Sequence, residues 1–232
     1  MQLVDVTPKA QVAVYDFDNT SIEGSSPSWL VNRLIFERRI SPITSLKIGF
    51  WGLAYKLHLP QNESWVRGQV FKAFAGKPRE EVDSYLRTFY DGYIEPRFRP
   101  AAHESMQKHV DQGHTVIVVS ASFEPIVLRA MELHPFSGQV STRMKIAKDG
   151  TYTREVDGLP VEGAEKLSAI KHWCDGHFGE GRWEIVAAYG DHHSDEPMLD
   201  SAKCAYAVTP DHGLARVAQE KGWPILDWSI DV

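Results

Sequence analysis

Cysteine is scarce in this sequence, which argues against a disulfide-stapled fold. Only Cys174 and Cys204 occur among 232 residues, whereas small secreted scaffolds carry several cysteine pairs. We expect two free thiols in a reducing compartment, with a single bridge between them as the alternative. The first residues, MQLVDVTPKAQ, also lack the basic start and apolar run of a signal peptide. These absences favour a cytoplasmic location.

Long hydrophobic runs and an excess of positive charge are missing as well. The most apolar long segment, residues 43–59, is interrupted by two lysines and is shorter than a bilayer span. We expect it to belong to a protein core; Phe50 and Trp51 leave an amphipathic helix lying on a membrane as the alternative. With 25 Lys and Arg against 31 Asp and Glu, the net charge is -6, so no nucleic-acid partner is expected.

Apolar runs rich in β-branched and aromatic residues alternate with helical patterns over most of the chain, of which 43% is hydrophobic. The predicted strands cover residues 12–15, 115–119, 184–189, 204–208 and 224–228. Between them, apolar residues recur three or four positions apart, as in a helix with one buried face. The alternation predicts an α/β fold, with a doubly wound, mostly parallel Rossmann-like sheet covered by helices on both faces.

One block interrupts this alternation. Residues 22–99 contain helical stripes and aromatic residues but no convincing strand. We therefore predict an α/β core domain formed by residues 1–21 and 100–232, with residues 22–99 as an inserted helical cap domain. Residues 144–156 predict a short hairpin with Asp149 and Gly150 at its tip.

The stretch VAVYDFDNT places two carboxylates, Asp16 and Asp18, where a buried strand ends. Aspartate is a poor strand residue, and a desolvated carboxylate pair repels itself unless a cation or a proton intervenes. Open α/β sheets bind ligands in the loops at the carboxyl ends of their strands. A reactive site is therefore one interpretation, and an Asp-rich turn with Thr20 as a cap is the other.

A serine and a lysine occupy two further element ends. Ser120 ends the second strand, and Ser122 lies beside the start of a helix, where a hydroxyl can bind a phosphate oxygen or simply cap the helix. Lys166 falls in the first turn of a later helix, where the helix dipole disfavours a cation unless an anion is near. A surface pair with Glu162 is the alternative for Lys166.

The end of the third predicted strand carries Gly190 and Asp191, followed by Asp195, which is either a fourth carboxylate of a site or a helix cap. The carboxyl ends of the strands meet at one edge of the predicted sheet, so these carboxylates are expected to converge there. Oxygen ligands in that number select a hard divalent cation, and Mg²⁺ suits a small open site better than zinc. The combination favours metal-assisted phosphoryl transfer with an aspartate nucleophile.

Four segments, DFDNT, VVSAS, GAEKL and GDHHSDEPML, resemble the four ordered motifs of the haloacid dehalogenase superfamily. The resemblance spans nearly the whole predicted core. The helical block after the first motif is similar to the cap of the phosphoserine-phosphatase-like branch, subfamily IB, whose members are mostly small-molecule phosphatases. The resemblance thus implies a phosphoric monoester hydrolase.

The resemblance also implies a role for each matched acidic residue. Asp16 would attack phosphorus and form an aspartyl-phosphate, while Asp18 would protonate the leaving group and then activate water. Mg²⁺ would be held by the Asp16 carboxylate, the Asp18 backbone carbonyl and Asp191. Asp195 would lie in or near the next layer of ligands, and Thr20 would support the loop.

The phosphoryl oxygens would be bound by a serine, a lysine and main-chain amides. The residues that the resemblance implies for this role are Ser120 and Lys166, with the amides around Phe17, Asn19 and Ala121.

Some residues depart from the family pattern. His192 and His193 stand where relatives usually carry small or polar residues; contact with substrate or metal is one interpretation, and a solvated loop pair is the preferred one. Glu23 and Arg67 are candidates for the cap glutamate and arginine that grip phosphoserine in the specific members. Because Glu23 lies nearer to the first motif than expected, phosphoserine is not assigned.

Three other functions use the same residues. A phosphotransferase would pass the phosphoryl group to an acceptor other than water. A lysolipid-phosphate phosphatase is suggested by the aromatic residues near Trp51, which would then give the cap a peripheral contact with a membrane. A phosphate-binding module without catalysis is the third, and the complete set of acid, nucleophile and lysine argues against it.

Overall fold

The computed structural model describes residues 8–41, 44, 47, 63–158, 160–163 and 165–230. Its centre is a six-stranded sheet in the order β3-β2-β1-β6-β7-β8, in which every pairing is parallel. The strands are β1 (Ala10–Asp16), β2 (Thr115–Phe123), β3 (Gly138–Thr142), β6 (Trp183–Gly190), β7 (Cys204–Val208) and β8 (Ile225–Leu226). The predicted α/β fold with a parallel sheet is confirmed.

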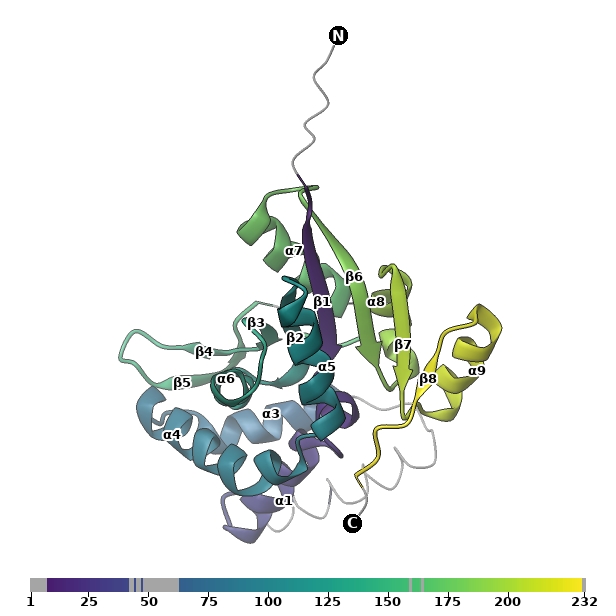
Figure 1. Ribbon diagram of the computed structural model, residues 1–232. Helices are drawn as coiled ribbons and strands as arrows, with labels where there is room; N and C mark the ends of the chain where they lie inside the picture. Colours follow the sequence, from purple (N-terminus) through teal and green to yellow (C-terminus); the bar gives the residue numbers. More distant parts are fainter. Residues whose placement is uncertain are drawn as a thin grey trace.

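Helices lie on both faces of the sheet (Figure 1). Five of the described helices in the chain segments that connect the strands of this sheet are α5 (Pro100–Asp111), α6 (Glu124–Leu133), α7 (Glu165–Phe178), α8 (Glu196–Asp200) and α9 (His212–Lys221). Along β1, Val12 and Val14 pack with one hydrophobic cluster while Ala13 and Tyr15 pack with the other. Successive strand residues point to opposite faces, so a strand that is buried on both faces is apolar throughout.

Two strands differ from the sequence-based expectation. The edge strand β3 was not predicted, because its sequence GQVST is short and only weakly apolar. Its first residue, Gly138, is packed so closely that a Cβ atom would lie 2.5 Å from the Trp173 ring and 2.7 Å from Ile117. The other edge strand, β8, is limited to Ile225–Leu226 and is thus shorter than predicted.

The described parts of the chain between β1 and β2 are mostly helical, as expected for an insertion between these two strands. Its described helices are α1 (Ser26–Phe36), α3 (Glu63–Phe74) and α4 (Arg79–Phe89), with shorter turns at Tyr90–Ile94 and Glu95–Arg97. In Figure 1 the arrowhead of β1 points toward the side of the molecule on which α1 and α3 lie. These described helices of the insertion therefore lie on the side of the sheet where β1 ends.

A narrow ribbon joins the two ends of the insertion. Ile22 and Phe98 form an antiparallel bridge. The Glu23 amide donates to the Arg97 carbonyl at 2.8 Å, and the Arg99 amide donates to the Ser21 carbonyl at 2.9 Å. The chain thus leaves the core and returns to it at almost the same point.

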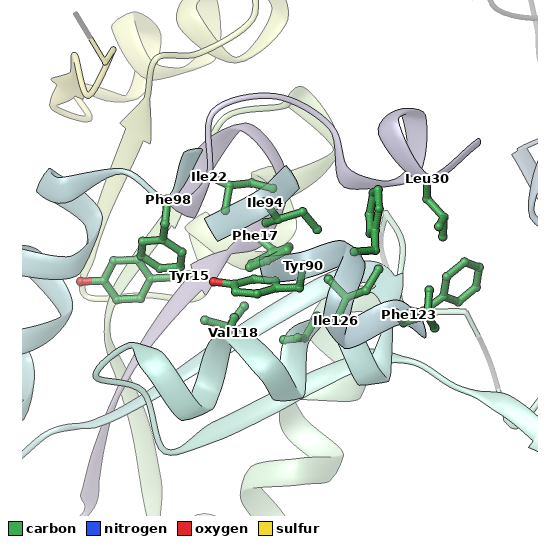
Figure 2. Close-up of a cluster of buried hydrophobic side chains, with 14 of the residues drawn as sticks. Tyr15, Phe17, Ile22, Leu30, Tyr90, Ile94, Phe98, Val118, Phe123 and Ile126 are labelled. Carbon is green, nitrogen blue, oxygen red and sulfur yellow. The ribbon is translucent and has the colours of Figure 1, made fainter. Parts of the chain in front are cut away.

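One hydrophobic cluster connects the insertion with the sheet. Figure 2 shows Tyr90 and Ile94 of the insertion beside Val118 of β2 and Ile126 of α6, and all four are buried. Fully burying a side chain of this kind stabilises the folded state by about 1.5–3 kcal/mol relative to leaving it exposed. Burial therefore holds the insertion against this face of the sheet.

The segment that suggested a membrane contact, residues 43–59, lies outside the described residues except for Thr44 and Lys47. Within the part of the chain that the structure describes, no helix combines the length and the apolar character needed to cross a bilayer. Cys174 is buried, Cys204 is exposed, and both are free thiols.

The predicted hairpin forms from β4 (Met144–Ile146) and β5 (Tyr152–Val156), which pair antiparallel. It docks on the insertion, because the Gly76 amide donates to the Tyr152 carbonyl at 2.8 Å and the Tyr152 amide donates to the Lys77 carbonyl at 3.0 Å. The Tyr152 hydroxyl also donates to Asp83 Oδ1 at 2.5 Å. The hairpin thus braces α4 from the side of the core.

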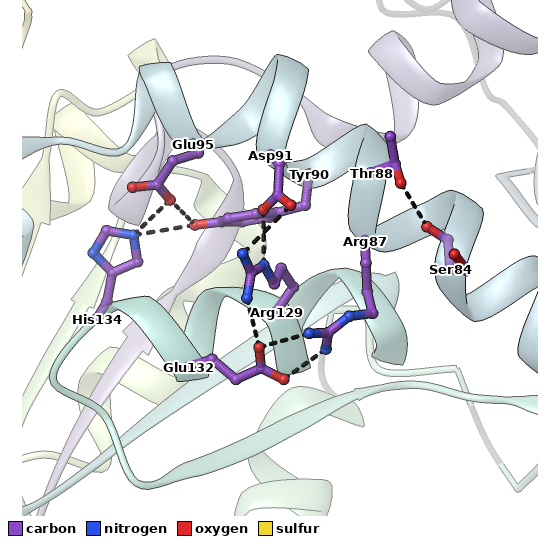
Figure 3. Close-up of polar contacts among 9 residues, drawn as sticks. All are labelled: Ser84, Arg87, Thr88, Tyr90, Asp91, Glu95, Arg129, Glu132 and His134. Atoms are coloured by element: carbon purple, nitrogen blue, oxygen red, sulfur yellow. Dashed lines mark hydrogen bonds and ion pairs between the residues drawn. The ribbon is translucent and has the colours of Figure 1, made fainter.

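Charged side chains join the insertion to α6 on the surface (Figure 3). The Arg87 guanidinium donates to both Glu132 oxygens at 2.6 and 2.7 Å, and Arg129 donates to Asp91 at 2.8 Å and to Glu132 at 2.7 Å. Hydrogen bonds from Arg87 and Arg129 hold the pKa of Glu132 down at about 2. Because these groups are exposed, salt screens them and each pair contributes little to stability.

A partly buried histidine lies under this network. His134 Nε2 is 3.0 Å from Glu95 Oε2 and 3.1 Å from Tyr90 Oη, as Figure 3 shows. Burial lowers the pKa of His134 below the usual value for histidine, although Glu95 opposes the shift. The folded state therefore disfavours the charged ring.

We expect the free energy of unfolding to fall as the pH drops from about 7 to about 5. In this window the unfolded chain protonates His134 while the folded chain resists protonation, so the unfolded state binds more protons and gains stability. Urea unfolding at several pH values measures the effect. His134→Gln should give a shallower pH dependence, and His172→Gln, an exposed histidine on α7, should keep the parent slope. If the free energy of unfolding depended on pH in the same way in His134→Gln and in the parent, the expectation would be contradicted.

Candidate active site

Three aspartates gather at the carboxyl edge of the sheet. Asp16 ends β1, Asp191 directly follows β6, and Asp195 lies in the turn that precedes α8. Each offers a carboxylate oxygen within 4.8 Å of the others. All three side chains are buried, and Asp195 has no exposed surface. Residues 16 and 191 come from neighbouring strands, which explains why the parallel sheet brings them together.

A buried lysine faces this cluster. Lys166, the second residue of α7, places its Nζ atom 2.6 Å from Asp16 Oδ1 and 2.7 Å from Asp195 Oδ1. The exposed fraction of Lys166 is 7%, so the surface pairing considered as an alternative does not describe this side chain. Its ammonium reaches the aspartates because α7 begins beside the carboxyl ends of the strands.

The charges of the cluster do not balance. Burial, together with the neighbouring Asp16 and Asp195 carboxylates, raises the pKa of Asp191 to about 9. Burial also raises the pKa of Asp16 to about 7, although Lys166 opposes the shift. Burial disfavours the charged form of Lys166, but the two adjacent carboxylates outweigh this and hold its pKa above the usual value. The site is therefore short of positive charge.

Asp18 points to a different set of partners. Its Oδ1 accepts from the Ser26 amide at 2.5 Å, and its Oδ2 accepts from the Ser122 hydroxyl at 3.1 Å; the two serine hydroxyls also hydrogen-bond each other. Burial raises the pKa of Asp18, while the bonds from Ser26 and Ser122 lower it. The Asp18 side chain thus lies at the start of α1, beside the aspartate cluster rather than in it.

The loop after β1 is held in an irregular turn, Phe17–Ser21. Asn19 adopts a left-handed backbone with φ 58°, and its amide donates to the Gly24 carbonyl at 3.0 Å. The Thr20 hydroxyl donates to Asp191 Oδ1 at 3.2 Å, and the Ser21 hydroxyl donates to the Asp16 carbonyl at 2.6 Å. Thr20 therefore links the β1 loop to the aspartate after β6.

The end of β2 carries two buried serines. Ser120 Oγ accepts from the Ser122 amide at 2.9 Å across Ala121. Ser122 does not cap α6: the strand continues to Phe123 and its hydroxyl goes to Asp18. Sequence reasoning missed the contacts of Asp18 with Ser26 and Ser122, although the Ser-Ser-Pro stretch signals the start of a helix.

The structure describes the two candidate substrate residues only in part. Glu23 is half-buried in the ribbon at the base of the insertion. The backbone of Arg67 belongs to α3, and its side chain lies outside the described residues. Sequence reasoning missed Arg99, which is 3% exposed and donates from Nη1 to the Trp228 carbonyl. Burial lowers the pKa of Arg99, and the nearby carboxylates of Glu23 and Asp191 oppose this.

The histidines of the fourth motif do not enter the aspartate cluster. His192 is half-buried and His193 is exposed, and both rings lie beside Asp211, the residue that caps α9.

Comparison with known proteins places this geometry in a family. The model of the haloacid dehalogenase-like hydrolases matches residues 13–200. Histidinol-phosphatase of Neisseria meningitidis is 25% identical over 227 residues, 94% of this chain and 98% of that protein. Phosphoserine phosphatase SerB1 of Mycobacterium tuberculosis is 26% identical over 222 residues, 94% of this chain and 71% of that protein.

A solved structure shares the fold. The phospho-aspartyl intermediate analogue of phosphoserine phosphatase superposes with a TM-score of 0.63 at 19% identity, covering 97% of this chain and 96% of the other. The matched region contains all four polar segments that meet at the sheet edge, from Asp16 to Asp195. The chain therefore belongs to the haloacid dehalogenase-like hydrolase family, with phosphatases of the phosphoserine-phosphatase type among its relatives.

Proposed function

We propose that this chain is a magnesium-dependent phosphatase that hydrolyses a small-molecule phosphomonoester through an aspartyl-phosphate on Asp16. The observation that carries the proposal is the buried cluster of Asp16, Asp191 and Asp195, in which Lys166 is the one cation in direct contact among the described residues. A structural core gains nothing from three desolvated carboxylates with one cation in direct contact. A site that receives a divalent cation and a phosphoryl group accounts for all of them.

The donor set fits Mg²⁺. Carboxylate oxygens are its usual protein ligands, and the raised pKa values of Asp16 and Asp191 mark the missing positive charge. Asp16, Asp191 and the Asp18 backbone carbonyl would hold the ion, with Asp195 and Thr20 orienting these groups. When bound, Mg²⁺ supplies charge stabilisation for the phosphoryl oxygens and keeps the nucleophile ionised.

In the proposed mechanism, Asp16 is the nucleophile and Asp18 transfers the protons. One Asp16 oxygen forms a bond to phosphorus as the bond to the leaving oxygen breaks, and Asp18 donates a proton to that oxygen. A raised pKa suits Asp18 for this role, since it favours the protonated acid. In the second step Asp18 takes a proton from water, which attacks phosphorus and releases Asp16 and inorganic phosphate.

The phosphoryl oxygens need positive partners in the transition state. We assign this role to the Lys166 ammonium and the Ser120 hydroxyl, with the amides of Phe17 and Ala121. The Asn19 amide, which donates to Gly24, would have to exchange that partner to take part. In this assignment Lys166 exchanges its contact with Asp16 for the incoming phosphate.

Substrate choice would fall to the insertion. We propose that residues 22–99 act as a cap over a core formed by residues 1–21 and 100–232, with Glu23 and Arg67 as candidate substrate contacts. The relatives named above make histidinol phosphate and phosphoserine the first compounds to test.

A screen of purified protein with Mg²⁺ tests the proposal. The panel contains histidinol phosphate, phosphoserine, sugar phosphates, nucleotides and lysolipid phosphates, and released phosphate is measured. Turnover of at least one monoester that disappears with EDTA and returns with Mg²⁺ is expected. The absence of turnover over the whole panel would contradict the proposal and favour a phosphate-binding module. Adding acceptor alcohols distinguishes hydrolysis from phosphotransfer.

A single methyl group at Gly190 should disturb this site. A Cβ atom there would lie 2.9 Å from Asp195 Cβ and Oδ2, so Gly190→Ala should push Asp195 away from Lys166. A displacement of about 1 Å at catalytic groups can cost about 100-fold, and we expect a loss of that order in kcat/KM. Gly176→Ala, where a Cβ meets no atom within 4 Å, should keep parent activity. Equal activity of both variants would contradict the assigned place of Asp195.

A further inference from the structure

Two histidines and an aspartate meet beside the active site. His192 Nε2 and His193 Nδ1 each lie 3.4 Å from the same oxygen, Asp211 Oδ2. The two rings are tilted by 49° relative to each other, with their centroids 4.1 Å apart. Among the described residues, this trio is one of two groups whose ligand atoms all lie within 4.8 Å of one another, the other being the aspartate cluster.

Both distances are long for a charge-assisted hydrogen bond, although the His193 contact still meets the limit for a weak one. An N–H donor and a carboxylate oxygen in a charge-assisted bond are normally about 2.7–2.9 Å apart, well below 3.4 Å. In a tetrahedral zinc site, two ligands at about 2.0–2.1 Å from the metal lie about 3.3–3.4 Å from each other. Both nitrogen-to-oxygen distances, from His192 and from His193 to Asp211, match this distance between two ligands.

Two of the remaining polar atoms of the trio have partners of their own. Asp211 Oδ1 accepts from the Leu214 amide at 2.6 Å and so caps α9, which leaves Oδ2 directed to the histidines. His192 Nδ1 lies 2.9 Å from Ser194 Oγ and 3.3 Å from the Ser194 amide, which donates to it. Metal binding at Nε2 requires the tautomer in which Nδ1 donates its proton to the Ser194 hydroxyl and gives up the longer amide contact. Such outer partners fix the tautomer and orientation of metal-binding imidazoles.

We propose that His192, His193 and Asp211 form a binding site for a zinc-class transition-metal ion, separate from the magnesium site. Two imidazoles and a carboxylate provide three protein ligands, and water or a substrate oxygen takes the fourth position. Nitrogen ligands favour zinc over magnesium. The Asp211 amide donates to the Asp191 carbonyl at 2.8 Å, so the two metal sites would share one backbone contact.

Titration with Co²⁺ tests the site directly, because tetrahedral Co²⁺ absorbs strongly in the visible range and octahedral Co²⁺ does so weakly. The full chain is titrated with an excess of Mg²⁺ present, and bound Zn²⁺ is then measured by competition. We expect one equivalent of tetrahedral Co²⁺ in the parent. His193→Ala and Asp211→Asn should each weaken binding by more than about 100-fold.

The variants are chosen to keep the fold. Asn at position 211 retains an oxygen that can cap α9, and His193 is exposed. His212→Ala removes the next histidine, which is exposed and belongs to neither group, and should bind as the parent does. Absence of tetrahedral Co²⁺ in the parent, or parent affinity in both site variants, would overturn the proposal. Binding lost in Asp16→Asn but kept in His193→Ala would also overturn it.

Discussion

Asp16→Asn should lower phosphatase turnover by about 10⁴-fold or more. An amide oxygen is a far weaker nucleophile than a carboxylate, and losing the nucleophile of a covalent mechanism removes most of the rate enhancement. The fold should persist, because the change relieves repulsion among three buried carboxylates and leaves Asp195 to pair with Lys166. Initial rates with the best substrate of the screen, together with far-UV circular dichroism, measure both effects.

The matched control for this substitution is Asp149→Asn at the hairpin tip. Asp149 Oδ1 accepts from Thr151, and an amide oxygen can replace it, so activity should stay at the parent level. Turnover retained by pure Asp16→Asn protein would mean that another group attacks phosphorus. A folded, inactive variant that still binds inorganic phosphate would separate the loss of chemistry from the loss of binding.

Lys166→Met should lower the free energy of unfolding by about 3–5 kcal/mol, because it leaves buried carboxylates without a counter-charge. The ammonium is the shared partner of Asp16 and Asp195, and a methionine of similar length keeps the packing while removing the charge. Turnover should also fall by about 100-fold or more, since a donor to the phosphoryl oxygens is lost. Urea unfolding and initial rates measure the two effects.

The pH dependence of the stability of Lys166→Met provides a second test of the role of Lys166. Without Lys166 the pKa of Asp16, already raised by burial to about 7, should rise further. The folded state then binds more protons than the unfolded state, so stability decreases as the pH rises. The loss in free energy of unfolding relative to the parent should therefore be larger at about pH 8 than at about pH 6. Saturating Mg²⁺ should reduce this loss.

The control for this substitution is Lys171→Met, on the exposed side of the same helix. Surface changes of this kind usually alter stability by less than about 0.5 kcal/mol. If Lys166→Met proved as stable as Lys171→Met, the buried ammonium would contribute nothing net to the folded state.

The strands that carry the site could be predicted because they are buried on both faces. A run such as VAVY before Asp16, or EIVAAY before Gly190, is apolar without interruption, and its end is marked by a residue that disfavours strands. The convergence of Asp16 and Asp191 then followed from the parallel topology. These strands and the meeting of their ends could be predicted because burial on both faces and parallel strand direction together allow few arrangements of the chain.

The parts that could not be predicted depend on contacts between distant segments. The partner of Asp18 on β2, Ser122, is 104 residues away, and no local pattern distinguishes this hydroxyl from a helix cap. Arg99 was missed because its burial against the Trp228 carbonyl is a tertiary effect. The strand β3 was missed because edge strands need little hydrophobicity.

The ribbon at Ile22 and Phe98 has a consequence for how such proteins diversify. Since the chain departs and returns through adjacent hydrogen bonds, segments of very different length can be exchanged at this junction. The strand end that carries Asp16 would keep its position, because Ser21 is fixed both to the Asp16 carbonyl and to the Arg99 amide. If the insertion selects the substrate, as proposed above, new substrate preferences can arise by exchange of whole inserts while the proposed catalytic groups keep their positions.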